Sequence, residues 1–447
     1  MHERTRRAVA RLMFVLCCAM PTFLTVAVVL VTLTPWFADY RRTCLERELS
    51  QRIGLRVEIA KCEFPAPATV RLSGVKLSEP ETGTKVATIH VVTWVNTDEK
   101  VAVRLSQPEL QSAMLPFAWR VIHDRFLCQP ELTTVPIRLA ADDLTIHSSS
   151  GAVTMRDVDT WLRPVDDGIE AMIQCVPAER TDAAAVHVSV VRSRKGVLPA
   201  TDWTLSTGDI QLHCSGLADY LPALRQLGPE ATFLGTMKWR IEGQQWSLDL
   251  GSSQFSDVDL AELTRGTAHR LTGDATIRLE RCQVEPGREL DVSGTMNAGS
   301  GFVSRSLLAS LAKELRFEIN PEIDASARDL AYETMAVRFD FFGSGMTLEG
   351  ICGKQRGLER LPHGIVLVGQ GRGMLASGQK TQSWVGLARS LWPQRTELLA
   401  VSPQTTWLFG VLPAPPSSDM DTESDDTKPP RITSADRLQN TPTIVQP

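Results

Sequence analysis

The sequence predicts a mainly β protein that begins with one transmembrane helix and contains a few short helices. Three observations predict this fold class. An uncharged apolar run lies near the N-terminus, apolar and polar residues alternate with a period of two in many later segments, and glycines or other turn-forming residues separate those segments. The 447-residue chain is long enough for two or three domains.

The apolar run covers residues 12–37 and is 26 residues long. A helix of that length exceeds the hydrocarbon core of a bilayer, roughly 30 Å thick, so it can cross with some tilt. Four arginines lie within residues 1–11, whereas only Arg41 and Arg42 follow the run closely. This excess predicts a cytoplasmic basic N-terminus over residues 1–11. The alternative is a cleaved signal peptide, but the run is too long for one, and Trp36 stands where a small-x-small cleavage site would need a small residue.

Composition excludes several classes of function. The formal net charge is −5, and basic and acidic residues are interspersed. The sequence therefore lacks the clustered basic residues that indicate nucleic-acid binding. Nine cysteines are present without any C-x-x-C spacing, so neither a disulfide framework nor a zinc site is predicted. Most of these cysteines are expected to be small buried apolar residues.

The segment after the apolar run is predicted to be a helix from Asp39 to Gly54, with Gly54 as its C-cap. From there the period changes to two. Val70 and Leu72 alternate with polar residues, and the phase slips by one residue after Gly74. A glycine at such a slip indicates a β-bulge or a tight turn.

The same alternation recurs in the second half of the chain, where it predicts a hairpin around Gly243 and a further strand around residues 337–341. Gly235, Gly273 and Gly294 lead several of these strands as a weak repeat. The apolar positions predicted to share one sheet face are Met237, Trp239, Ile241, Trp246, Leu248, Leu250, Val337, Phe339 and Phe341.

Two short amphipathic helices are predicted, from Leu217 to Leu227 and from Ser304 to Leu315, with Ser304 as an N-cap. Leu387 and Leu391 belong to an apolar stripe with Trp384 and Trp392. Such a stripe indicates either an interfacial membrane segment or, with more weight, the core face of a docked helix. Residues 413–447 are rich in Pro, Ser, Thr and Asp and are predicted to be a disordered acidic tail.

No catalytic, cofactor or metal site is predicted, and the chain is not expected to be an enzyme. Residues 366–374 lack G-x-G-x-x-G spacing and a βαβ context, so a glycine-rich turn is favoured over nucleotide binding. The adjacent carboxylates at residues 142–143 and 166–167 are interpreted as solvated turns, because neighbours on a strand point to opposite faces. His123-Asp124 and His213-Cys214 lack a third partner at ligand spacing.

The order of these signals resembles the AsmA-like family of bacterial envelope proteins (AsmA/TamB type). A basic N-terminus and an apolar helix lead into ELSQRIGLRVEIA, and the phrase ATVRLSGVKLSEPETGTKVATIHVV follows. Two later segments, DYLPALRQLGPEATFLGTMKWRIEG and VSGTMNAGSGFVSRSLLASLAKEL, are similar to the C-terminal region of that family. The family's strand and turn pattern is carried here by Leu72, Val75, Leu77, Glu79, Pro80 and Gly83.

The resemblance implies an elongated, curved and mostly antiparallel sheet with an apolar, groove-like concave face. It further implies two β-rich regions, residues 38–200 and 201–412, on the periplasmic side of a single-pass inner-membrane anchor. The implied role is lipid transport or outer-membrane assembly, with membrane lipids and envelope proteins as partners, and the nine apolar positions above would then face lipid. The same alternation would equally supply the inside of a β-sandwich. The alternative function is therefore a membrane-anchored scaffold without a lipid groove.

Overall fold

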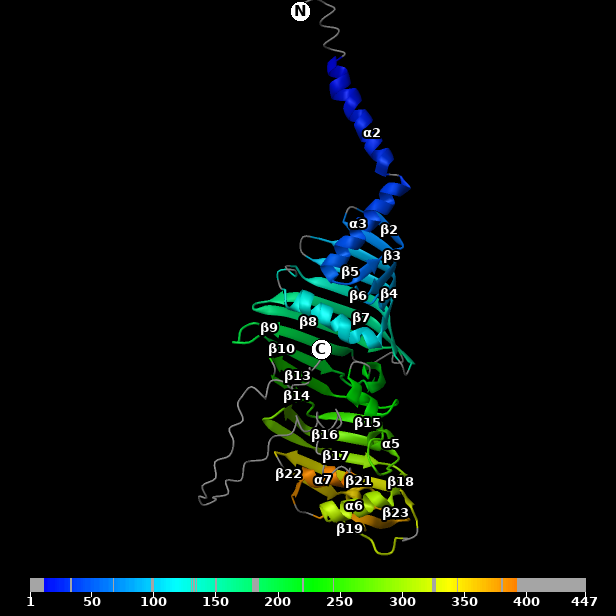
Figure 1. Cartoon of the computed structure of the whole chain (residues 1–447), viewed down its shortest axis with the longest axis vertical. Helices are drawn as coiled ribbons and strands as arrows, with labels where there is room; N and C mark the ends of the chain where they lie inside the picture. Colours follow the sequence, from blue (N-terminus) through cyan, green and yellow to red (C-terminus); the bar gives the residue numbers. More distant parts are fainter. Residues whose placement is uncertain are drawn as a thin grey trace, which may run out of the picture.

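A computed structural model describes residues 12–391, except for residues 33, 67, 98–99, 130, 132, 134, 149–150, 179–184, 219–220, 244, 324–326, 344 and 379–380. The predicted basic N-terminus, residues 1–11, and the predicted acidic tail, residues 413–447, lie outside this part. The described chain is mainly β, as predicted. It is elongated, and its strands lie across the long axis one after another (Figure 1).

The N-terminal apolar segment forms a continuous helix over Leu12–Thr32, which is long and apolar enough to cross a membrane. It contains a π-helical turn, η1 (Val15–Ala19), and the α-helix α2 (Met20–Thr32). A second helix, α3 (Pro35–Ile53), begins after Thr34, whose hydroxyl accepts a hydrogen bond from the Phe37 amide at 3.4 Å. The last residues of the predicted span therefore belong to α3. Figure 1 shows α2 extending away from one end of the sheet.

The remaining helices are short. The α-helices are α4 (Leu115–Ile122), α5 (Leu260–Thr264), α6 (Arg305–Leu315) and α7 (Trp384–Leu391). A π-helical turn, η3 (His123–Leu127), extends α4, and the 3₁₀ turns are η2 (Ser112–Met114), η5 (Cys214–Leu217), η6 (Pro222–Leu227) and η7 (Cys352–Lys354).

The strands of the N-terminal half are β1 (Arg56–Glu58), β2 (Lys61–Ala66), β3 (Thr69–Ser78), β4 (Lys85–Asn96), β5 (Val101–Gln111), β6 (Ile137–Ser148), β7 (Gly151–Val165), β8 (Gly168–Pro177), β9 (Val186–Ser193) and β10 (Ala200–Ser206). Those of the C-terminal half are β11 (Leu212–His213), β12 (Thr232–Leu234), β13 (Thr236–Glu242), β14 (Gln245–Asp249), β15 (Ser253–Asp259), β16 (Asp274–Glu285), β17 (Glu289–Ala298), β18 (Gly301–Ser304), β19 (Glu318–Ile319), β20 (Asp329–Tyr332), β21 (Thr334–Phe342), β22 (Gly345–Gly350), β23 (Ile365–Gly369), β24 (Arg372–Ala376) and β25 (Gln382–Ser383).

One sheet of 23 strands contains all of these except β18 and β20, which pair with each other. Each strand from β3 to β10 pairs with the next, and the ladder continues through β13, β14, β16, β17 and β21. The pairing is antiparallel except between β5 and β6, which are parallel. That parallel step needs a crossover connection, and α4 with its flanking turns provides it.

Several strands contain a residue with positive φ that shifts the alternation of side chains. Gly74 in β3 has φ +63°, and Gln107 in β5 and Asp157 in β7 have φ +49° and +52°. The slip predicted at Gly74 is thus confirmed, because Leu72 and Val75 are both buried on the same side. At Asp157 the register between β7 and β8 also shifts, and a β-bulge of this kind bends the strand and increases its twist.

The helices pack against one face of the sheet. Leu45 and Leu49 of α3 contact a cluster that includes Leu72 of β3. Trp119 of α4 packs on a cluster that includes Leu162 of β7. The core at the far end joins α6 and α7 to β16, β17 and β21 through residues such as Leu308. Figure 1 shows α4, α6 and α7 in front of the strands.

Four short-range predictions are confirmed in this arrangement. Gly54 caps α3 in the left-handed conformation at φ +81°. The Ser304 hydroxyl accepts a hydrogen bond from the Leu307 amide at the start of α6. Residues 366–374 form a glycine-rich hairpin between β23 and β24. Leu387 and Leu391 of α7 pack into the C-terminal core, so these two residues of the stripe lie on the core face of a docked helix.

Two short-range predictions are wrong. The helix predicted from Leu217 to Leu227 is instead two 3₁₀ turns, η5 and η6, separated at Leu221, whose backbone leaves the helical region before Pro222. The residue before a proline is pushed toward extended geometry, which interrupts a helix there. Asp142 and Asp143 are not in a turn. They lie within β6, where Asp142 pairs with Arg104 of β5 at 2.9 Å.

Candidate functional site

The most extended feature of the sheet is an apolar row that crosses ten strands in register. Its members are successive cross-strand partners from β5 to β17, so their side chains project from the same face. They are Val101, Ile137, Leu162, Ala171, Val190, Trp203, Trp239, Leu248, Val284 and Leu290. At about 4.8 Å between neighbouring strands, the row is about 43 Å long. It is longer than one leaflet's share of the hydrocarbon core, about 15 Å.

The hairpin predicted around Gly243 is present as β13 and β14, and its apolar residues lie on the face of this row. Trp239 pairs with Leu248, Ile241 pairs with Trp246, and Met237 pairs with Leu205 of β10. Leu250 follows β14 and belongs to the same apolar clusters.

The three predicted positions on β21 also lie on this face. Val337, Phe339 and Phe341 alternate along the strand, and the rings of Phe339 and Phe341 are 5.7 Å apart. Phe339 joins Trp246 and Leu248 in one cluster, which β16 and β17 bridge. The structure thus brings β14 and β21 together on one surface, although about 90 residues separate them in the sequence.

The helices that the structure describes cover parts of the apolar face and leave other parts uncovered. Over β10, Trp119 of α4 reaches Trp203, with 4.0 Å between ring centroids. Beyond β10, the apolar cluster around Cys282 and Val284 is formed by residues of β14–β17, β21 and the turn after β14. Among the residues that the structure describes, no helix contributes to this cluster. The side chains here are partly exposed. We call this surface the apolar window, defined by Trp239, Ile241, Trp246, Leu248, Leu290 and Val292.

The opposite face of the same strands is polar and carries cross-strand ion pairs. Arg240 of β13 lies 3.2 Å from Asp202 of β10, and Arg281 of β16 lies 3.1 Å from Asp291 of β17. Each exposed ion pair contributes little to the stability of the fold. The pairs are nevertheless consistent with the strand register that aligns the apolar row on the other face. A hollow of about 290 Å³ among β10, β13, β14 and β16 is lined mainly by this face, including Asp202 and Arg240.

Comparison of the chain with protein-family models, curated proteins and solved structures gives no match. The AsmA-like resemblance therefore stays a prediction, and the geometry of the face carries the functional argument.

A second cluster lies where α4 ends. His123, Asp124 and Cys128 place one potential metal-ligand atom each within 4.8 Å of the others. The sequence interpretation missed Cys128, because the π-helical turn η3 brings it next to His123. Arg192 Nη1 lies 3.1 Å from His123 Nε2, so a guanidinium already occupies the space beside this imidazole. Burial raises the pKa of the Cys128 thiol, which disfavours the thiolate that binds metals.

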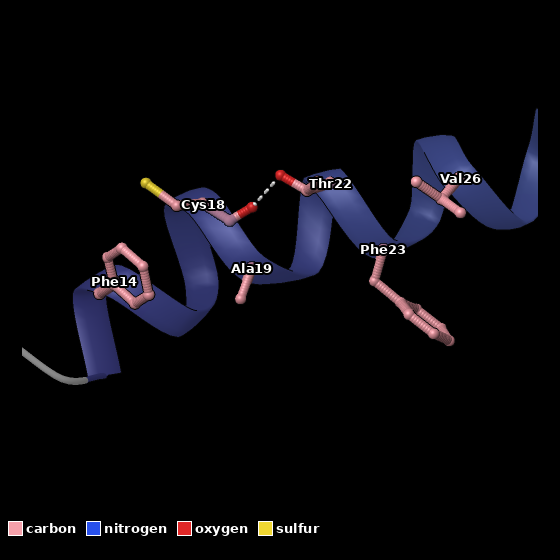
Figure 2. A pocket seen from close by; sticks show the side chains of 6 residues that line it. All are labelled: Phe14, Cys18, Ala19, Thr22, Phe23 and Val26. Carbon is pink, nitrogen blue, oxygen red and sulfur yellow. Dashed lines mark hydrogen bonds between the residues drawn. The ribbon is translucent and has the colours of Figure 1, made fainter.

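The apolar helix carries a shallow depression bordered by the rings of Phe14 and Phe23, with Cys18, Ala19 and Thr22 between them (Figure 2). The Thr22 hydroxyl donates a hydrogen bond to the Cys18 carbonyl oxygen at 2.6 Å. This bond satisfies the hydroxyl within the helix, as polar residues in an apolar span require.

Sequence reasoning missed several residues of the apolar face. Trp203 and Leu205 alternate with Asp202 and Thr204, and Leu290 and Val292 flank Asp291. The period-two signal was therefore present. The missing information was cross-strand register, which decides whether distant alternating segments share a face.

Proposed function

We propose that this chain is a membrane-anchored, non-enzymatic protein that binds lipid acyl chains along the apolar face of its sheet. The observation that carries the proposal is the ten-strand apolar row, which, within the described part of the chain, runs into a partly exposed window instead of a second sheet layer. A contiguous surface of two tryptophans and several aliphatic side chains that stay partly exposed indicates a binding site.

The energetics fit a carrier better than a storage protein. Burying one methylene is worth about 0.8 kcal/mol, and a single sheet shields about one side of a chain. Contact with six methylenes would then contribute roughly 2–3 kcal/mol. Binding of that strength holds an acyl chain transiently and allows it to move along the row.

The proposed location follows from the helix and its flanking charges. The helix Leu12–Thr32 would anchor the chain in the inner membrane, with the N-terminus in the cytoplasm and the sheet in the periplasm. A reporter fused after Pro447 should be active only outside the cytoplasm. Activity in the cytoplasm would overturn the proposed orientation.

Lipid content of the purified full-length protein tests the binding proposal. Trp246→Asp places a charge in the window, whereas Ser247→Asp places the same residue on the polar face opposite Arg240. We expect phospholipid per protein, measured by mass spectrometry, to fall for Trp246→Asp and to stay unchanged for Ser247→Asp. Both variants keep the same lipid around the anchor, so the difference in lipid content between them reports binding at the window. Equal lipid content in two folded variants would contradict the proposal.

The second candidate is a periplasmic scaffold that binds envelope proteins. One observation favours it. The connection between β9 and β10 presents a fully exposed Val197 and a half-exposed Leu198 next to Lys195. A partner protein could bind this projecting apolar tip. Val197→Ser with Leu198→Ser should then abolish capture of an envelope protein and leave lipid content unchanged.

A further inference from the structure

Exposed aromatic residues gather where α2 meets the sheet. Trp36 and Tyr40 lie one turn apart on α3, with side chains 70% and 57% exposed and ring centroids 6.0 Å apart. Phe64, 44% exposed, lies near the tip of the β2–β3 hairpin. These residues come from α3 and β2, and both elements lie at the end of the sheet next to α2 (Figure 1).

Arg41 connects the two elements. Its guanidinium carbon lies 3.7 Å from the centroid of the Phe64 ring and 5.8 Å from that of Phe37. Arg42 adds a second link, since its Nη1 donates a hydrogen bond to the Ala60 carbonyl oxygen at 3.4 Å. Strand β2 and the residue before it are thus held against the first turns of α3.

The position of this cluster along the chain matches the boundary of a bilayer. The 21 residues of Leu12–Thr32 extend about 31 Å, which equals the thickness of a hydrocarbon core. Arg41 lies at most about 9 Å further along α3 than Pro35. The polar layer of each leaflet is roughly 5–8 Å thick, so a tilted α3 keeps the cluster within or beside it.

The side chains have the chemistry of that layer. Tryptophan and tyrosine are enriched at headgroup level, because their rings are apolar and their N–H or O–H groups can bind water or lipid oxygens. Arginine can pair with lipid phosphate there. In water alone, the same residues would leave a contiguous apolar patch beside the anchor.

We infer that Trp36, Phe37, Tyr40, Arg41 and Phe64 form an aromatic collar that binds the headgroup layer of the membrane crossed by α2. The inference rests on the proposed membrane span of α2. The collar fixes the β2–β3 hairpin to the membrane surface. It therefore sets the direction in which the sheet, and the apolar row on it, leaves the bilayer.

Photo-crosslinking from two equally exposed phenylalanines tests the collar. The full chain is reconstituted in vesicles of phosphatidylcholine and phosphatidylglycerol, with p-benzoyl-phenylalanine in place of Phe64. The control replaces Phe342, which is also 44% exposed but is the last residue of β21, a strand at the end of the sheet away from α2 (Figure 1). Carbonate extraction of the same vesicles reports whether α2 holds the chain in the bilayer.

The expected result is phospholipid adducts at position 64 in several-fold excess over position 342, in carbonate-resistant vesicles. Equal adduct yields at the two positions in such vesicles would overturn the collar and leave the membrane span intact. Release of the chain by carbonate would overturn the span and, with it, the collar.

Discussion

At the scale of single residues, position on one face or the other decides what each side chain does. Trp239 pairs with Trp203 and Leu248 on the apolar face, whereas its neighbour Lys238 projects from the polar face. The two residues share a strand and a backbone environment and differ in the surface that they meet. Replacing both by the same residue therefore isolates the contribution of the face.

Trp239→Ser should lower the free energy of unfolding by about 2 kcal/mol, because it removes a large, partly buried ring from the row. Lys238→Ser should change it by less than about 0.5 kcal/mol, as surface substitutions do. Urea unfolding of the full-length protein in detergent, followed by circular dichroism, gives both values. Equal losses at the two positions would mean that the alternation does not separate a buried face from a solvated one.

Cysteine reactivity offers a second measurement at this scale. Burial raises the pKa of the Cys282 thiol to about 11, so at pH 8 only about one thiol in a thousand is ionised. The thiolate is the reactive form. Cys282 should therefore react far more slowly with N-ethylmaleimide than the exposed Cys44 of α3. Its rate should rise with pH and should approach that of Cys44 in urea. Rapid labelling of Cys282 in the native protein would contradict its burial beneath the window.

At the scale of elements, local sequence signals identified what a few neighbouring residues determine. Gly54 ends α3 and Ser304 begins α6 because capping depends on residues within one turn. The alternation around Gly243 identified the β13–β14 hairpin for the same reason. Helix α4 was not predicted, since it is short and its packing on β7 and β8 decides its structure.

The positive φ of Gly74 provides a prediction for one strand. A Cβ at Gly74 would lie 2.8 Å from the Cβ of Ala60, whereas a Cβ at Gly83 would meet no atom within 4 Å. Both glycines have positive φ, so alanine at either position is strained by about 1 kcal/mol. Gly74→Ala adds overpacking and should destabilise by about 1–2 kcal/mol more than Gly83→Ala. Thermal melts of the two variants measure this difference, and identical melting temperatures would show that β3 does not approach Ala60 so closely.

At the scale of the whole molecule, the apolar row could not be predicted from the sequence. Its ten members are spread over residues 101–290, and their alignment depends on the register of nine strand pairs, including the parallel pair β5–β6. A one-residue slip in any pair would move every later side chain to the other face. The sequence therefore predicted the apolar positions on β13, β14 and β21, but not that β16 and β17 join them into one surface.

The central claim is that the apolar window contacts lipid, and adjacent residues of β14 test it most directly. Leu248 projects into the window and Ser247 projects from the polar face, and both are partly exposed. A photo-crosslinking residue is placed at either position of the full chain in cells, and the adducts are identified by mass spectrometry. We expect lipid adducts from position 248 and none from position 247. Adducts only to protein at position 248, including to this chain's own residues beyond Leu391, or equal lipid adducts from both positions, would contradict the account.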